Sequence, residues 1–262
     1  MKGGLLALRL WKKKMPPREE KMLKQRFTIE EGVFDAKTRI TLYEFMNKGI
    51  ISCLDYPIAT GKEADVYRAT AGFGLKDNVD FVAAKIFRVE TSNFLRMQDY
   101  IYTDPRFLKV KRVKREVVYA WAKKEFKNLN ICSEARVPAP KPYAFSRNVL
   151  LMEFLGEEGI PDSSLAQIGS ERPEEDCETL LGYVKRLYQH GFVHADLSEY
   201  NVLLHGYPDY KLYLIDLGQG VLTEHPKAEE FLARDVANVL RYFKKYGVKR
   251  DFAEVLEWVK KK

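Results

Sequence analysis

Cysteine is scarce in this chain, and no two of its cysteines are close together. Cys53, Cys132 and Cys177 form no CxxC pair, so the sequence predicts neither a disulfide framework nor a cysteine zinc site. No apolar run reaches the roughly 18 residues that a membrane-spanning helix needs, and Arg9 interrupts the short apolar stretch Leu5–Leu10. We therefore expect a cytoplasmic protein in a reducing compartment, without disulfides and without a membrane partner.

Charge and hydrophobicity are both plentiful. Hydrophobic residues make up 46% of the 262 positions, which is enough for a substantial core in one large domain or two small lobes. The net charge of +7 suits an acidic partner such as a nucleotide, a phosphate or a nucleic acid. A basic surface can also serve solubility alone, so the charge by itself decides nothing further.

The first part of the chain changes from helical to strand character. Residues 1–26 predict a loose arm or one short amphipathic helix, and Thr38–Asn47 has helical spacing. Ile50–Tyr56 fits either a further helical turn or the start of a strand. Asp65–Thr70 and Phe81–Phe87 predict two strands joined by a glycine-containing hairpin loop.

Beyond this hairpin, Thr91–Phe107 shows no clear period, and we assign no helix or strand to it. A buried strand is predicted at Val149–Phe154, and two short strands around Val202 and Leu214. The spacing of apolar residues predicts four helices, at 113–129, 177–190, 226–245 and 250–260.

Two short motifs carry residues suited to phosphoryl transfer. Asp196 and Asn201 lie five residues apart in His194–Asn201, and Asp216 follows in an Ile-Asp-Leu-Gly stretch. Upstream, Lys85 lies within a predicted strand. Phosphoryl transfer uses one carboxylate to orient the attacking group, a carboxamide and a second carboxylate to hold magnesium, and a lysine to neutralise phosphate charge.

Each of these residues also has an ordinary structural interpretation. Asp196 alone could be a turn aspartate, and Asp216 alone could cap a strand end. Their order and spacing together are similar to the protein-kinase signature, with HxDxxxxN for the catalytic loop and DxG for the metal carboxylate.

The expected phosphate loop departs from that signature. A kinase loop reads GxGxxGxV, whereas Ala59–Val66 keeps only Gly61. We expect a stiffer loop, in which Thr60 and Lys62 supply polar contacts in place of backbone amides. The alternative for this segment alone is an ordinary β-turn.

Longer stretches resemble the RIO family of atypical protein kinases. These stretches are Thr60–Tyr67, His194–Asn201, Leu214–Val221 and Phe231–Val239. The resemblance is to the first subfamily, because fewer than 60 residues precede the loop, too few for the winged-helix domain of the second. It implies an α+β, minimal two-lobed kinase fold, with an antiparallel sheet and an αC helix in the first lobe and a truncated helical second lobe.

The resemblance also implies the roles of individual residues. Asp196 would be the catalytic aspartate, Asn201 and Asp216 the ligands of Mg²⁺ (or Mn²⁺), and Lys85 the lysine on the ATP phosphates. Asp216 would in addition be able to accept the phosphoryl group, giving an ATPase-like switch. The implied role of the protein is in maturation of the small ribosomal subunit.

Two further parts of the ATP site follow from the kinase pattern. Glu125 begins a Glu-Phe-Lys-Asn-Leu stretch that resembles the αC motif, so we assign it as the partner of Lys85, with Glu116 as the second choice. Met152, Glu153 and Phe154 would form the hinge that binds adenine through the main chain. A buried strand end is an equally compatible interpretation of that segment.

We divide the chain into an arm and helix at 1–48, a first lobe at 49–155 and a second lobe at 156–262. The first lobe would contain an insertion at about 90–112, which the resemblance implies to be flexible. Only 46 residues follow Asp216, so we expect no activation segment and no platform for extended peptides. Autophosphorylation, ATP hydrolysis or action on one docked partner are the expected activities.

The segment Arg106–Arg115 holds six basic residues in ten and predicts contact with ribosomal RNA, or else a solvated helix start. Two other functions remain open at this stage. One is a nucleotide-gated module that binds pre-ribosomal RNA with incidental turnover. The other is a small-molecule phosphotransferase, which the short chain after Asp216 disfavours.

Overall fold

The computed structural model describes residues 34–90 and 94–261, and the chain divides into two compact units, Met1–Glu44 and Phe45–Lys262. Helix α3 (Ala36–Asn47) begins where the Asp35 carboxylate accepts the Thr38 N–H at 2.7 Å, which satisfies a backbone donor of the first turn. The predicted helix is confirmed and starts two residues earlier than expected. The predicted arm at 1–26 lies outside the described residues.

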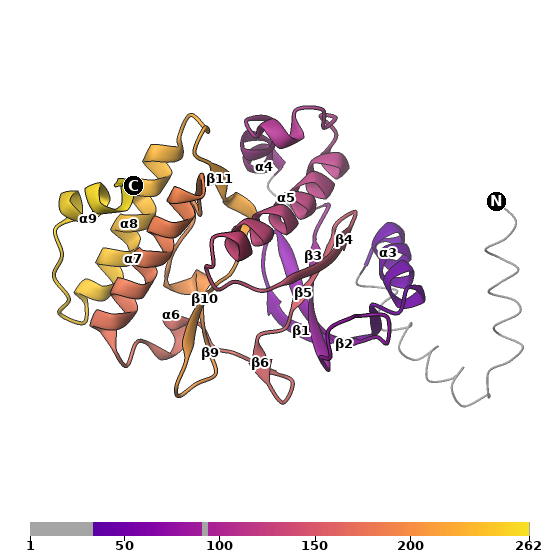
Figure 1. Ribbon diagram of the computed structural model, residues 1–262. Helices are drawn as coiled ribbons and strands as arrows, with labels where there is room; N and C mark the ends of the chain where they lie inside the picture. Colours follow the sequence, from indigo (N-terminus) through magenta and orange to yellow (C-terminus); the bar gives the residue numbers. More distant parts are fainter. Residues whose placement is uncertain (1–33, 91–93, 262) are drawn as a thin grey trace, which may run out of the picture. The chain divides into compact units, whose positions relative to one another are not determined.

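Five antiparallel strands form the sheet of the second unit, in the order β1-β2-β3-β5-β4 (Figure 1). Their bounds are β1 Ile51–Thr60, β2 Ala64–Ala71, β3 Phe81–Phe87, β4 Pro142–Ser146 and β5 Val149–Glu153. The predicted hairpin is confirmed, and Ile50–Tyr56 enters a strand rather than continuing a helix. Strand β4 was not predicted, because it is a half-buried edge strand that begins with a proline.

Two helices follow β3. Helix α4 (Phe94–Tyr102) and a short 3-10 turn (Pro105–Phe107) occupy most of the stretch to which we assigned no element, so that interpretation was wrong there. Its buried residues Met97, Tyr100 and Ile101 have helical spacing. Helix α5 (Lys114–Glu134) then crosses beside the sheet (Figure 1) and runs five residues beyond the predicted end.

The remainder of the chain is mainly helical. A hairpin of β6 (Gly156–Glu157) and β7 (Ile160–Pro161) leads into α6 (Leu165–Ile168). The predicted strands are β9 (Val202–His205) and β10 (Lys211–Leu214), which pair as a hairpin. The small strands β8 (Phe192–Val193) and β11 (Val221–Leu222), which were not predicted, pair with each other.

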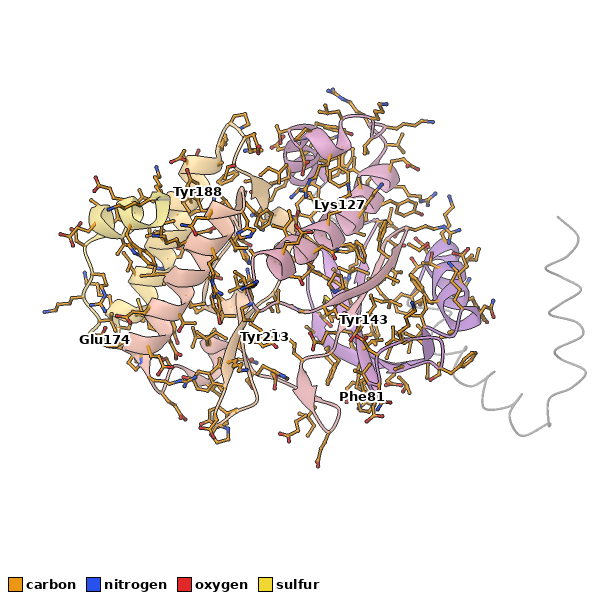
Figure 2. The ribbon with its side chains drawn as sticks, in the orientation of Figure 1. Phe81, Lys127, Tyr143, Glu174, Tyr188 and Tyr213 are labelled. Carbon is orange, nitrogen blue, oxygen red and sulfur yellow. The ribbon has the colours of Figure 1, made fainter. Side chains whose placement is uncertain are left out.

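The predicted second-half helices are confirmed as α7 (Pro173–Gln189), α8 (Ala228–Lys244) and α9 (Phe252–Lys260). Figure 2 shows Glu174 and Tyr188 at opposite ends of α7. Tyr188 donates to Glu229 at the start of α8 at 2.8 Å, so the two helices run antiparallel. Gly191 ends α7 with a φ of 72°, the left-handed conformation that glycine favours after a helix.

The α+β kinase-like fold is therefore as predicted. Within residues 34–90 and 94–261, no helix combines the length and the apolar character needed to cross a bilayer. All three cysteines carry free thiols.

Candidate active site

A cleft of about 790 Å³ lies between the sheet and the loops around β9 and β10. Most of the residues predicted for nucleotide and metal binding line it. They are Ala59, Thr60, Gly61, Lys62, Val66, Lys85, Met152, Glu153, Asn201 and Asp216. Its apolar lining also includes residues that we did not predict, among them Ile58, Ala83, Leu203 and Ile215. An apolar cleft with a few convergent polar groups is typical of a small-molecule site.

Strand register explains why three of these residues share one face. Ala59 pairs with Val66 across β1 and β2, and Val66 pairs with Lys85 across β2 and β3. Residues directly opposite each other in an antiparallel sheet point to the same side. Gly61 turns the chain between β1 and β2, and a Cβ there would lie 3.1 Å from the Ala64 carbonyl oxygen.

Lys85 lies between two carboxylates. Its Nζ donates to both oxygens of Glu125, at 2.7 and 2.9 Å, and to Asp216 Oδ1 at 2.9 Å. Burial opposes the charge on Lys85, but Asp216 and Glu125 outweigh it and hold its pKa above the ordinary value. Of the two acids considered, Glu125 is the partner of Lys85, whereas Glu116 is exposed and lines a different groove.

One face of α5 holds the loop that follows Asp216 in place. Lys124 Nζ donates to the carbonyl oxygens of Gly218, at 2.9 Å, and Gly220, and Asn128 Nδ2 donates to Leu217 O at 2.7 Å. Trp121 packs so closely that a Cβ on Gly218 would lie 2.6 Å from its Nε1, which explains the glycine of the DxG motif. These α5 residues, with Glu125, follow the i, i+3, i+4, i+7 spacing of one helix face.

Hydrogen bonds orient the residues of the predicted catalytic loop, His194–Asn201. Asn201 Nδ2 donates to the backbone oxygen of Asp196 at 2.8 Å, which turns Asn201 Oδ1 away from that contact. Gln219 Nε2 donates to Asp196 Oδ2 at 2.7 Å. Burial, followed by the charge of Asp216, raises the pKa of Asp196. His194 is buried and neutral, since burial lowers its pKa to about 4, and its Nε2 contacts Ile215 O at 3.2 Å.

Asp235 on α8 anchors the backbone of this loop. Its carboxylate accepts the N–H groups of Ala195 at 2.7 Å and Leu197 at 2.9 Å. Ala195 has a φ of 66°, a conformation that costs a non-glycine residue about 1 kcal/mol or more. The Asp235 bonds hold that strained backbone in place.

Asp216 and Asn201 form a suitable donor pair for magnesium. Asp216 has a φ of 60°, its side chain is 46% exposed, and the Lys85 charge holds its pKa below the ordinary value, so it is a carboxylate. The described residues contain no group of three or more His, Cys, Asp or Glu placed to bind a metal. Carboxylate and carboxamide oxygens are the hard donors that Mg²⁺ prefers, and this ion takes many of its other ligands from phosphates and water.

Only part of the predicted hinge segment lines the cleft. Met152 and Glu153 line the cleft, but Phe154 does not belong to its lining. The Phe154 ring packs edge-on against Phe81, with ring centroids 5.9 Å apart, and Figure 2 labels Phe81 at the start of β3. The Phe154 ring therefore contacts Phe81 and does not line the cleft.

Comparison with known proteins agrees with this geometry. Residues 65–255 match the model of the RIO domain. The RIO-type serine/threonine-protein kinase Rio1 of Haloferax volcanii is 42% identical over 233 residues, which is 89% of this chain and 78% of that protein. The chain belongs to the RIO family. It is a RIO-type serine/threonine protein kinase, and a kinase takes its phosphoryl group from ATP.

Other RIO proteins are similar over different shares of their length. Rio1 of Thermoplasma acidophilum is 40% identical over 197 residues, 75% of this chain and all of that protein. Human RIO1 is 36% identical over 85% of this chain, which spans only 39% of the human protein. A crystal structure of the Rio2 kinase–ADP/Mg²⁺-phosphoaspartate complex from Chaetomium thermophilum aligns with a TM-score of 0.61 and 21% identity, over 84% of this chain and 66% of that one. The last comparison supports the fold.

Several residues of the candidate site were missed by the sequence analysis. Ala83 lies two residues before Lys85 on the same face of β3, so period-two spacing could have identified it. Asp235 lies in the recognised Phe231–Val239 stretch without a role having been assigned to it. Gln219 lies in the recognised Leu214–Val221 stretch, also without an assigned role. Arg96, which donates to Gln219 Oε1 at 2.7 Å, had no recognisable signal, because its importance depends on which segments meet in space.

Proposed function

We propose that this RIO kinase transfers the γ-phosphate of ATP to itself or to one docked partner during maturation of the small ribosomal subunit. The observation that carries the proposal is the convergence of Lys85, Asp216 and Asn201 at the wall of one cleft, with Asp196 joined to Asn201. These are the parts that phosphoryl transfer requires. Magnesium, when bound, would neutralise charge on the phosphates.

Lys85 would bind the ATP phosphates, and its contact with Glu125 fixes where it points. Asn201 and Asp216 would hold the metal, and the cleft residues of the hinge would receive adenine. Asp196 would accept the proton of the attacking hydroxyl or water. Its raised pKa, caused first by burial, makes it a better proton acceptor than an ordinary aspartate.

Asp216 is a second candidate acceptor. Its carboxylate is ionised and about half exposed, so an oxygen can attack phosphorus. The step forms one bond between Asp216 and the γ-phosphorus and breaks the bond to the leaving ADP, with no proton transferred. The Rio2 complex named above contains a phosphoaspartate, which supports this route for the present chain.

The test is incubation of the protein with Mg²⁺ and γ-labelled ATP, following free phosphate and protein-bound label together. Asp196→Ala should abolish transfer to a hydroxyl or to water, which must lose a proton, whereas Asp209→Ala, the same change in an exposed loop, should not. Hydroxylamine cleaves an acyl phosphate but not a phosphoserine, so label that it releases is on a carboxylate, and loss of that label in Asp216→Asn would support Asp216 as the acceptor. Equal turnover in wild type and Asp196→Ala would refute the assignment.

Contact with ribosomal RNA is supported by a basic groove of about 750 Å³ beside the 105–111 segment and α5. Lys109, Lys111 and Lys123 are exposed along it. Arg106 is committed elsewhere, since it pairs with Asp104 and donates to Asn128. The groove also keeps open the alternative of a nucleotide-gated RNA-binding module with incidental turnover.

Serine substitutions of five basic residues of this region should weaken RNA binding and flatten its salt dependence. Each lost phosphate contact lowers the slope of log K against log salt by about 0.7–0.9. The substituted residues are Lys109, Lys111, Arg112, Lys114 and Arg115. The matched control removes five charges near α8, at Arg241, Lys244, Lys245, Lys249 and Arg250. Equal slopes for the two variants would refute the RNA surface.

A further inference from the structure

Helix α4 is connected to the catalytic aspartate by a chain of hydrogen bonds through Gln219. Arg96 Nη2 donates to Gln219 Oε1 at 2.7 Å, and the Tyr100 hydroxyl donates to the same oxygen at 3.2 Å. Gln219 Nε2 donates to Asp196 Oδ2 at 2.7 Å. These hydrogen bonds therefore join α4 to the loop that follows Asp216 and to the loop that carries Asp196.

The two donors determine which way the Gln219 amide faces. A glutamine amide has one oxygen acceptor and one NH₂ donor, and Arg96 can only donate. Because Oε1 receives the Arg96 bond, the NH₂ group is left for Asp196, which as a carboxylate can only accept. Without Arg96 and Tyr100, the amide would be free to rotate away from the productive orientation.

Packing makes this orientation a rigid one. Gln219 and Tyr100 are both buried, each with 8% of its surface exposed. The Tyr100 ring meets Trp121 edge-on and stacks on Phe231, with centroids 5.8 Å apart in both pairs. Tyr100 is thus fixed between α5 and α8, whereas Arg96 is exposed and contributes mainly its donor and its charge.

We propose that Gln219 is a positioning residue for Asp196, held in its working orientation by Arg96 and Tyr100 of α4. The inference rests on the proposed phosphoryl transfer and assigns to α4 a part in it. Gln219 occupies Asp196 Oδ2, so the attacking hydroxyl or water is received by Oδ1. Helix α4 thereby contributes to catalysis through Arg96 and Tyr100.

This role predicts a loss in kcat without a matching change in KM for ATP. Gln219 and Arg96 do not belong to the lining of the nucleotide cleft, so ground-state binding of ATP should be preserved. A misplaced catalytic carboxylate lowers the rate by about tenfold to a hundredfold. A merely structural role would instead lower the thermal midpoint and reduce kcat only as protein unfolds.

The experiment measures label transfer from ATP for Gln219→Met, Arg96→Met and the double variant. Gln219→Met should lower kcat at least about tenfold with KM for ATP within about twofold. If Arg96 acts through Gln219, adding Arg96→Met to Gln219→Met should lower kcat no further. Gln98→Met, the same change elsewhere on α4, is the control and should match wild type.

Unchanged kcat in Gln219→Met, or additive losses in the double variant, would overturn the proposal. A second measurement does not depend on turnover. The side-chain amide NMR signal of Gln219, identified by its loss in Gln219→Met, should shift and exchange faster with water in Asp196→Ala. An unaltered signal would refute the pairing even in a protein that transfers no phosphate, whereas absent transfer in wild type counts against the proposed function.

Discussion

Removing Glu125 should leave a positive charge buried at Lys85. The Glu125 side chain is 1% exposed and that of Lys85 is 10% exposed, so water cannot replace the lost carboxylate. Breaking a buried pair by removing one partner costs about 3–5 kcal/mol. Asp216 remains 2.9 Å from Lys85 Nζ, and we therefore expect Glu125→Leu to lower the free energy of unfolding by about 3 kcal/mol, the low end of this range.

The double variant Lys85→Met/Glu125→Leu provides the decisive comparison. It removes both charges, and Asp216, which is about half exposed, can then be solvated by water. We expect it to lose less than about 1.5 kcal/mol, so that it is more stable than Glu125→Leu alone. Equilibrium urea unfolding followed by tryptophan fluorescence measures both values, and Trp121 on α5 reports on this region.

Glu116→Leu is the matched control, since Glu116 is exposed on the same helix. Its free energy of unfolding should change by no more than about 0.5 kcal/mol. The reasoning is refuted if Glu125→Leu is as stable as this control. It is also refuted if the double variant is less stable than Glu125→Leu, because the buried charge would then not be the source of the cost.

Three further predictions concern the loops of the site. Gly218→Ala should lower the free energy of unfolding by about 1–3 kcal/mol, because the added methyl group clashes with Trp121. Gly182→Ala is the control on α7: nothing lies within 4 Å of its added methyl group, and it should raise the free energy of unfolding by about 0.5–1 kcal/mol. Equal urea midpoints for the two variants would contradict this prediction. Asp235→Ala leaves two buried N–H groups, of Ala195 and Leu197, without their acceptor and should lower the free energy of unfolding by about 2–4 kcal/mol. A loss of less than about 1 kcal/mol in urea unfolding would show that the loop does not depend on Asp235. Burial lowers the pKa of Lys124 to about 7 in the folded protein. Between pH 7 and the ordinary lysine pKa, the unfolded chain therefore binds more protons at Lys124 than the folded protein does, and the free energy of unfolding rises with pH. Relative to Lys124→Met, the wild type should gain more than about 1 kcal/mol between pH 7 and pH 9, and a constant difference would mean that the buried lysine stays charged.

Much of the fold was predictable because its elements are locally periodic. The apolar spacing of α7, α8 and α9 predicted all three helices to within a few residues. Helix α4 and strand β4 were missed for different reasons. The aromatic residues of α4 obscured its spacing, and the half-buried residues of β4 show no alternation because it is an edge strand.

Some residues of the candidate site were likewise predictable from local patterns, and others were not. Asp196, Asn201 and Asp216 lie in short segments whose residue types and spacing reveal their chemistry. The link from Arg96 to Gln219 spans 123 positions in the chain, and no local pattern predicts that two such residues will meet. The position of Phe154 against Phe81, outside the cleft, likewise follows from the packing of β3 against the hinge segment.

Residue types and their spacing were enough to predict the reaction chemistry, the family resemblance and a helix that carries a partner for Lys85. Glu116 and Glu125 are nine residues apart, which is two and a half turns of an α-helix, so they lie on opposite faces and only one can reach the sheet. Helical periodicity predicts that Glu116 and Glu125 lie on different faces of α5, but it does not predict which face packs toward Lys85. Only the packing of α5 against the sheet and the metal loop made that choice, since burial of Glu125 requires the charge of Lys85 beside it.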